Sequence, residues 1–157
     1  MTTTLETARD ILAEIDAVLS QVSEAEVTAL CDAILQARNI IIHGLGREGL
    51  VMRGFAMRLM HLGLKSAVVG DMTAPPAGPN DLFLVACGPG RLATIQALMD
   101  IARHAGCHCA LLTAQPDGPL ARQADLVVTL PAQTMAESEQ SRSFQAMGSV
   151  FEQSLWI

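Results

Sequence analysis

The sequence contains few aromatic and few charged side chains. Among its 157 residues there are four Phe, one Trp and no Tyr, and charged residues make up 17% of the chain, against about 25% in ordinary globular domains. The shortage of aromatic rings argues against a stacking platform for nucleic-acid bases. The net charge of −6 is opposite in sign to a surface that binds phosphate backbones, so we expect no nucleic-acid partner. With 50% hydrophobic residues, the low share of solvating side chains favours a homo-oligomer.

Long hydrophobic runs and paired cysteines are also absent. No stretch approaches the ~18 consecutive apolar residues of a membrane span. The first residues include Glu6 and Asp10 instead of the basic and apolar segments of a signal peptide, so we expect a cytoplasmic protein without membrane contact. The four cysteines form no CxxC pair, which favours reduced thiols. In the cysteine-rich run 107–109, an extended backbone would point His108 away from both thiols, so we expect no metal site there.

The length suits a single α/β domain over residues 1–157. Two N-terminal helices are predicted. Apolar residues recur at helical spacing over 5–22, and Ser23 with Glu26 forms a capping box that opens a second helix ending near Asn39. We expect these helices, over 5–37, to pack on the domain or across an oligomer interface.

Short apolar runs alternate with helical segments in the rest of the chain. The predicted strands are 40–42, 66–69, 82–86, 108–112 and 126–130, with helices at 50–62 and around 95–101. Continuously apolar strands in such alternation predict a five-stranded parallel sheet sandwiched by helices and joined by right-handed crossovers. The polar residues over 132–143 predict a loop or flap, followed by a last helix that begins near Phe144.

Two glycine-bearing loops follow predicted strands and are the first candidates for a ligand site. GLGREG runs from Gly44 to Gly49, and CGPG runs from Cys87 to Gly90. Ligands of open α/β sheets bind beyond the carboxyl ends of the strands, where glycines allow a close backbone approach and a helix N-terminus offers N–H groups to an anion. GLGREG matches neither a dinucleotide fingerprint nor a P-loop. A tight turn without a ligand therefore remains the alternative.

Several segments together resemble one family. GLGREG, FAMRLMHLG (55–63), VVGDMTAP (68–75), ADLVVTLPA (124–132) and MGSVFEQSL (147–155) are similar to the sugar isomerase (SIS) domain family, and most to its 6-phospho-3-hexuloisomerases. The resemblance covers nearly the whole chain, and FAMRLMHLG and MGSVFEQSL are its most specific parts. It implies a flavodoxin-like α/β sandwich that works as a tetramer. It also implies interconversion of 3-hexulose 6-phosphate and fructose 6-phosphate through an enediol, without a cofactor.

The resemblance further implies two catalytic residues, with Glu152 of FEQ as the base and His61 of RLMHLG as its partner. Moving a carbonyl by one carbon needs a base that takes a proton from carbon and returns it to the neighbouring carbon. Desolvation raises the pKa of a carboxylate, and Glu152 follows Phe151 in an apolar stretch. A histidine shuttles protons near neutral pH. From spacing alone, a solvated glutamate and a core histidine are the more ordinary interpretations.

Both loops depart from the family pattern at residues that would contact a phosphate. The first has Glu48 where the family has serine, and the second has Cys87, Pro89 and Leu92 where the family has two serines and a threonine. Hydroxyl donors are lost, and Pro89 removes a backbone N–H. A carboxylate at residue 48 should repel a phosphate.

Two arginines remain as anion ligands. Arg47 matches the family and Arg91 is additional, and either could bind phosphate or pair with Glu48. Cys87 has the position of a nucleophile at a strand end, but an inert small residue is favoured. The predicted substrate contacts are Gly44, Gly46, Arg47, Glu48, Cys87, Gly88, Gly90 and Arg91.

We expect a sugar-phosphate isomerase whose partners are a small sugar or sugar phosphate and further copies of the chain. One alternative is a non-catalytic SIS-domain protein that binds a carbohydrate derivative and has a diverged phosphate site. The other is an isomerase of a different sugar. The fold alone does not decide between them, because function depends on the site.

Overall fold

The computed structural model describes residues 3–136 and 143–157. Within them, five strands form one parallel sheet in the order β2-β1-β3-β4-β5, which is the flavodoxin-like order. The strands are β1 (Ile40–His43), β2 (Ser66–Val68), β3 (Leu82–Ala86), β4 (His108–Thr113) and β5 (Leu126–Thr129). The predicted α/β class and parallel sheet are confirmed, and the predicted strand ends differ by no more than one residue.

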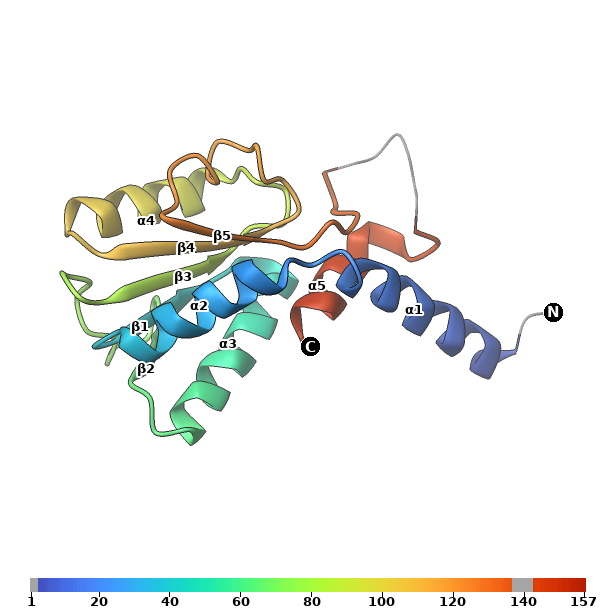
Figure 1. Ribbon diagram of the computed structural model, residues 1–157, viewed down its shortest axis with the longest axis horizontal. Helices are drawn as coiled ribbons and strands as arrows, with labels where there is room; N and C mark the ends of the chain where they lie inside the picture. Colours follow the sequence, from blue (N-terminus) through green and yellow to red (C-terminus); the bar gives the residue numbers. More distant parts are fainter. Residues whose placement is uncertain (1–2, 137–142) are drawn as a thin grey trace.

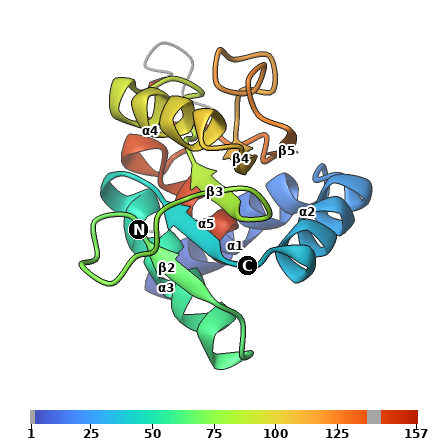
Figure 2. The ribbon, with the colours of Figure 1, turned by 90° about the vertical axis from the view of Figure 1, so that its left-hand side faces the viewer.

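Helices cover both faces of the sheet. They are α1 (Thr4–Leu19), α2 (Glu24–Gln36), α3 (Gly46–His61), α4 (Ala93–His104) and α5 (Ser149–Leu155). α4 covers one face while α2 and α3 cover the other, and α1 and α5 lie beyond the carboxyl ends of the strands (Figures 1 and 2). In the described part of the chain, no helix has the length and apolar character needed to cross a membrane.

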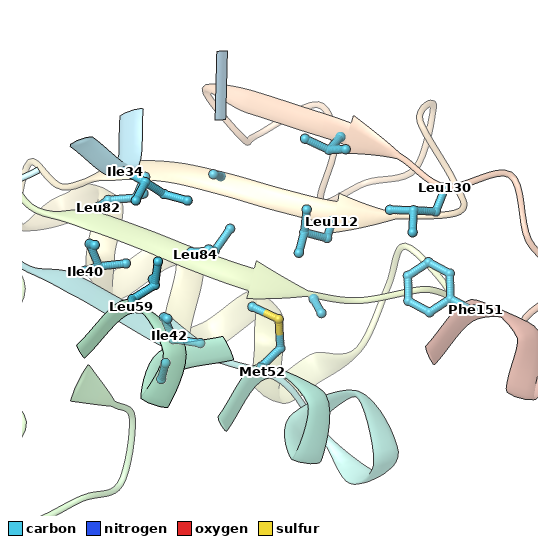
Figure 3. Packing of buried hydrophobic residues seen from close by; sticks show 14 of the residues in the cluster. Ile34, Ile40, Ile42, Met52, Leu59, Leu82, Leu84, Leu112, Leu130 and Phe151 are labelled. Carbon is cyan, nitrogen blue, oxygen red and sulfur yellow. The ribbon is translucent and has the colours of Figure 1, made fainter. Parts of the chain in front are cut away.

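The buried strands divide their side chains between two hydrophobic clusters. Ile40 and Ile42 of β1 pack toward α3, whereas Ile41 packs toward α4. Figure 3 shows the first cluster, in which Met52 faces the sheet and the Phe151 ring lies at the carboxyl end of β3. Every residue of β3 is buried because both of its faces are covered. Full burial of each Leu, Val or Phe side chain contributes about 1.5–3 kcal/mol of transfer free energy.

The predicted capping box at the start of α2 is half wrong. The Ser23 hydroxyl accepts a hydrogen bond from the Glu26 backbone N–H at 3.4 Å, as expected. The Glu26 carboxylate, however, does not return to Ser23; it accepts from the N–H of Thr129 in β5 at 2.8 Å. β5 lies at the edge of the sheet, where a backbone N–H has no neighbouring strand to bond. Glu26 therefore attaches α2 to the edge strand.

Two helices begin at places that differ from the predictions. α3 begins at Gly46 rather than near residue 50, so Arg47 and Glu48 belong to its first turn. α5 begins at Ser149 rather than near Phe144, and both residues before it have positive φ, 62° at Met147 and 68° at Gly148. Continuous helical periodicity in the sequence does not reveal this local break.

The N-terminal helices pack on this chain's own domain. α1 contacts α5, and α2 packs on β5. The Glu14 carboxylate of α1 accepts hydrogen bonds from the Ser143 hydroxyl, the Phe144 N–H and the Gln145 side-chain amide. This network fixes the start of the C-terminal segment. Within the expected flap over 132–143, residues 137–142 lie outside the described residues.

Candidate functional site

The two glycine loops meet at the switch point of the sheet. They follow β1 and β3, which are paired from Ile40 with Leu82 to His43 with Val85. The next strand after β1 lies on one side of this pair, and the next strand after β3 lies on the other. In open parallel sheets this reversal creates the crevice in which ligands bind. α5 lies beyond the same carboxyl ends of the strands (Figure 1).

Glu152 of α5 and Arg47 of α3 form an ion pair at the carboxyl end of the sheet. Arg47 Nε lies 3.0 Å and its terminal NH2 nitrogen 2.9 Å from Glu152 Oε1. Arg47 also donates to the carbonyl oxygen of Met147. The Glu152 side chain is 13% exposed, and its Oε2 is buried without a hydrogen-bond partner among the described residues. The predicted base thus presents one oxygen to a fixed cation and keeps the other free.

Glu48 is a buried carboxyl group between the two glycine loops. The residue is 7% exposed, and its Oε1 accepts the backbone N–H of Gly88 at 3.1 Å. Its Oε2 is buried and has no hydrogen-bond partner within the described parts of the chain. Burial, with a smaller contribution from the charge of Glu152, raises the pKa of Glu48 to about 7. Neither of the pairs considered from the sequence, Arg47 with Glu48 or Arg91 with Glu48, is present, since Arg47 pairs with Glu152.

Gly88 packs tightly against both carboxyl-bearing elements. A Cβ added to Gly88 would lie 2.9 Å from the Phe151 ring and 3.0 Å from Glu48 Oε1. The absence of a side chain lets the Gly88 N–H reach the carboxyl group of Glu48. The second loop is therefore sealed by α3 and α5 at this point.

The remaining predicted loop residues differ in exposure. Gly44 lies against Gly49 in the turn, Gly46 starts α3 with φ of 55°, and Gly90 has φ of 71° beside Gln115. The Arg91 side chain is exposed, with no hydrogen bond or ion pair among the residues the structure describes. These residues lie in the loops that follow the paired strands β1 and β3, and their contacts with a substrate stay a prediction.

Cys87 is buried at the end of β3 and is not a reactive thiol. Burial, reinforced by the negative charge of Glu48, raises its thiol pKa to about 12. A thiol of that pKa is almost entirely protonated at neutral pH, and only the thiolate is nucleophilic. The inert interpretation of Cys87 is favoured on this ground.

His61 lies away from the other predicted site residues. It is exposed at the last turn of α3, whereas Arg47 and Glu48 are in the first. A helix rises 1.5 Å per residue, so roughly 20 Å of helix separates His61 from Glu48. Within one chain, His61 and Glu152 are not brought together.

The sequence did not single out His43, the last residue of β1. Its Nε2 is buried without a hydrogen-bond partner in the described structure, and burial together with the charge of Arg53 lowers its pKa. A polar residue directly after Ile40–Ile42 at a carboxyl strand end was the available signal. His43 is thus an uncharged imidazole beside the first glycine loop at neutral pH.

A pocket of about 390 Å³ opens beside Glu152, on the side of α1 and the C-terminal segment. Its lining residues are Ile15, Val51, Glu152, Gln153, Trp156 and Ile157. A larger pocket of about 450 Å³ lies at the amino ends of the strands, around Asp81 and His108. Among the described residues, no group of three or more His, Cys, Asp or Glu is arranged to hold a metal ion. Of these two pockets, the one beside Glu152 borders the predicted base, and no residue of either glycine loop lines it.

Comparison with known proteins agrees with this architecture. A family model described as "SIS domain" matches residues 33–156. The 3-hexulose-6-phosphate isomerase of Mycobacterium gastri is 40% identical over 157 residues, which cover 100% of this chain and 77% of the relative. The protein of the same name from Bacillus subtilis (strain 168) is 35% identical over 155 residues, 98% of this chain and 84% of the relative.

A solved structure leads to the same family. A crystal structure from Methanococcus jannaschii, from which a function of 3-hexulose-6-phosphate isomerase was inferred, matches with a TM-score of 0.77 and 29% identity, covering 95% of this chain and 80% of that one. The fold class expected from the resemblance is thereby confirmed. Because the family model spans most of the sequence, the chain belongs to the SIS domain family.

Proposed function

We propose that this protein is a sugar-phosphate isomerase that interconverts 3-hexulose 6-phosphate and fructose 6-phosphate in the cytoplasm. The observation that supports it most is the position of Glu152: a carboxylate at the switch point, oriented by Arg47 and bordering a pocket. The relatives from Mycobacterium gastri and Bacillus subtilis that bear this enzyme name span almost the whole chain.

The reaction needs proton transfer and no change of oxidation state overall. Glu152 takes the proton from C2 of the 3-hexulose and returns it to C3 of the enediol, while a hydroxyl proton passes from the oxygen on C2 to the oxygen on C3, so the carbonyl moves from C3 to C2. Arg47 binds Oε1 of Glu152, which leaves Oε2 without a hydrogen-bond donor among the described residues and available for the proton transfer. The guanidinium also places positive charge beside the developing enediolate.

Arg91 and the N-terminus of α4 are the proposed phosphate ligands. The Arg91 guanidinium is exposed, whereas that of Arg47 is already bound to Glu152. Leu92, the N-cap of α4, gives no side-chain cap, and the first turn of α4 contains no acidic residue. Free N–H groups and a guanidinium form an anion site. They replace the hydroxyl donors that this sequence lacks.

His61 assists only if a neighbouring subunit supplies it. It is exposed at the far end of α3, where a second copy of the chain in the proposed tetramer has access to it. Mixing Glu152→Gln with His61→Ala tests this proposal, because sites formed from the two unmodified residues would recover activity. Recovery to about a quarter of wild-type activity is expected for random mixing. No recovery would contradict a site that combines Glu152 of one subunit with His61 of another.

An isomerase assay with 3-hexulose 6-phosphate tests the proposed reaction. Wild type should turn over, and Glu152→Gln should lose about 10²–10⁴-fold in kcat. Glu24→Gln, a substitution of the same type at an exposed position of α2, should retain full activity. Absence of turnover by the wild-type protein would rule out the proposed activity.

A non-catalytic sugar-phosphate binding protein is the second candidate. It is favoured by the contact of the Glu48 carboxyl with the Gly88 N–H, because a phosphate would otherwise compete for that amide. Thermal shifts with sugar phosphates in the absence of turnover would support this candidate. Turnover of a non-phosphorylated ketose alone would instead identify an isomerase of a different sugar.

A further inference from the structure

Two carboxyl groups of the site, Glu48 and Glu152, lie near the same cation, Arg47. Arg47 is bound to Oε1 of Glu152 through two nitrogens. Glu48 lies one residue further along α3, and the hydrogen bond that it accepts comes from a neutral donor, the Gly88 N–H. Glu48 and Phe151, the residue before Glu152, both pack against Gly88. The two carboxyl groups therefore share one small buried region with a single guanidinium.

Each carboxyl group has one oxygen without a partner. Oε2 of Glu48 and Oε2 of Glu152 are both buried, and neither accepts a hydrogen bond from any described residue. Two ionised carboxylates beside one guanidinium would leave an uncompensated negative charge in this region, which is unfavourable. One added proton makes the group of three side chains neutral.

We propose that Glu48 and Glu152 hold a single proton between them, which resides on Glu48 and leaves Glu152 ionised as the base. Glu48 is then a positioning residue that sets the charge around Glu152; this role rests on the proposed isomerase function. Glu48 is the more buried of the two residues and has no cation of its own. Its raised pKa, about 7, agrees with this location of the proton.

The groups that face Glu48 define what else could titrate with it. They are Arg47 on its own helix, Glu152 from α5 and the Cys87 thiol at the end of β3. Cys87 stays protonated because burial raises its pKa to about 12, and an arginine stays charged. Among Glu48 and these described neighbours, Glu48 is the group whose raised pKa, about 7, lets it change charge near neutral pH.

The first test detects the proton directly and needs no substrate. Infrared difference titration of the wild-type protein should show the carbonyl band of a protonated carboxylic acid that disappears with a midpoint near pH 7. Glu48→Gln should lack the band, and Glu152→Gln should move its midpoint to lower pH, because a negative neighbour is removed and Arg47 is released. Glu26→Gln, which changes a carboxylate bonded to Thr129 N–H, should leave the band unchanged.

The second test uses the pH dependence of turnover. In wild type, kcat/KM should fall by about tenfold per pH unit above pH 7 as Glu48 ionises. In Glu48→Gln, whose amide has the shape of the protonated acid and does not titrate, kcat/KM should no longer decrease above pH 7. A purely structural Glu48 would lower activity at all pH values without changing the profile.

The two tests separate the failure of this proposal from the failure of the proposed function. A missing infrared band, or one that Glu152→Gln does not move, overturns the shared proton whether or not the protein turns over substrate. An alkaline decrease that persists in Glu48→Gln overturns the link between Glu48 and the base. If wild type shows no turnover, the isomerase function fails, and the infrared titration alone decides where the proton lies.

Discussion

Arg47 binds a single oxygen of Glu152 through two of its nitrogens, with Nε at 3.0 Å and NH2 at 2.9 Å. Replacing Arg47 with Gln should lower kcat/KM by roughly 10–100-fold, because the carboxylate loses both its orientation and its cation. The free energy of unfolding should also fall, because the variant leaves the Glu152 carboxylate, whose side chain is only 13% exposed, without its cation. Steady-state kinetics and urea denaturation measure the two effects.

Arg53→Gln is the matched control for Arg47→Gln. Arg53 lies on the same helix and forms an exposed ion pair with Asp71 at 3.3 Å. Its replacement should leave kcat/KM within about twofold of wild type, because an exposed pair of this kind contributes little free energy. Equal losses in both variants would show that Arg47 supports α3 and does not act through Glu152.

The sequence predicted the sheet because its five strands are short apolar runs between helical segments, and burial on both faces requires that pattern. It also predicted that the two glycine loops lie at the same end of the sheet, because parallel strands have their carboxyl ends together. The side-chain partners were harder to predict. Glu26 bonds Thr129, which is 103 residues away, and Arg47 bonds Glu152, which is 105 residues away. Such pairs depend on packing that local periodicity does not record.

Glu48 shows the same limit in another form. The sequence identified it as a departure from the family, and a negative charge in the loop was the expected effect. In the folded chain the residue is buried and its pKa is raised to about 7, so its charge depends on pH. Burial is a tertiary property, and a residue in the first turn of a helix is normally exposed to solvent.

Replacing Glu48 with Gln should change how stability depends on pH. The Glu48 pKa is 4.5 in the unfolded reference and about 7 in the folded chain. Between these values the folded state holds the extra proton, so the Glu48 contribution to stability is present below pH 4.5 and is lost as the pH rises through 7. The total loss is roughly 3 kcal/mol.

Urea denaturation of wild type and Glu48→Gln across pH 5–8 measures this difference. We expect the stability of the variant relative to wild type to increase with pH over this range, because only wild type ionises a buried carboxyl group. A difference that stays constant with pH would contradict the raised pKa. Glu24→Gln provides the exposed control, whose difference from wild type should not follow this pattern.

Asp81 directly precedes β3, at the amino ends of the strands. Its carboxylate accepts Arg38 Nε at 3.0 Å, the Arg38 NH2 at 2.8 Å and the Asn39 amide at 2.8 Å, and Asp81 is 1% exposed. Asp81→Ala should lower the free energy of unfolding by roughly 2–3 kcal/mol, because charge-assisted hydrogen bonds to a buried group are lost. Asp71→Ala, which removes an exposed pair with Arg53, should change it by less than about 0.5 kcal/mol. Similar losses in both variants would contradict this assignment.

The cysteines should differ sharply in reactivity. Cys31 is exposed, while Cys87, Cys107 and Cys109 are buried, and burial raises the thiol pKa of the three to about 12, 11 and 12. Alkylation of the native protein at pH 8 should therefore modify Cys31 alone, because only thiolates react quickly. Mass spectrometry of peptides measures the site. Rapid labelling of Cys87 under native conditions would overturn the inert assignment.

Two glycines at close contacts should respond to alanine in opposite ways. Gly148, the N-cap of α5, has φ of 68°, and a Cβ there would lie 2.5 Å from the backbone carbon of Thr134. Gly148→Ala should therefore destabilise the fold by more than about 2 kcal/mol, since the left-handed conformation costs roughly 1–2 kcal/mol and the backbone contact adds to it.

A Cβ at Gly54 meets only the ring of Trp156, a side chain that is 62% exposed. The ring can move outward, and alanine is the better helix former by about 1 kcal/mol, so Gly54→Ala should leave stability near or above that of wild type. Thermal unfolding of the two variants tests this contrast. Because α5 carries Glu152, Gly148→Ala should also reduce isomerase activity at temperatures where the rest of the domain remains folded.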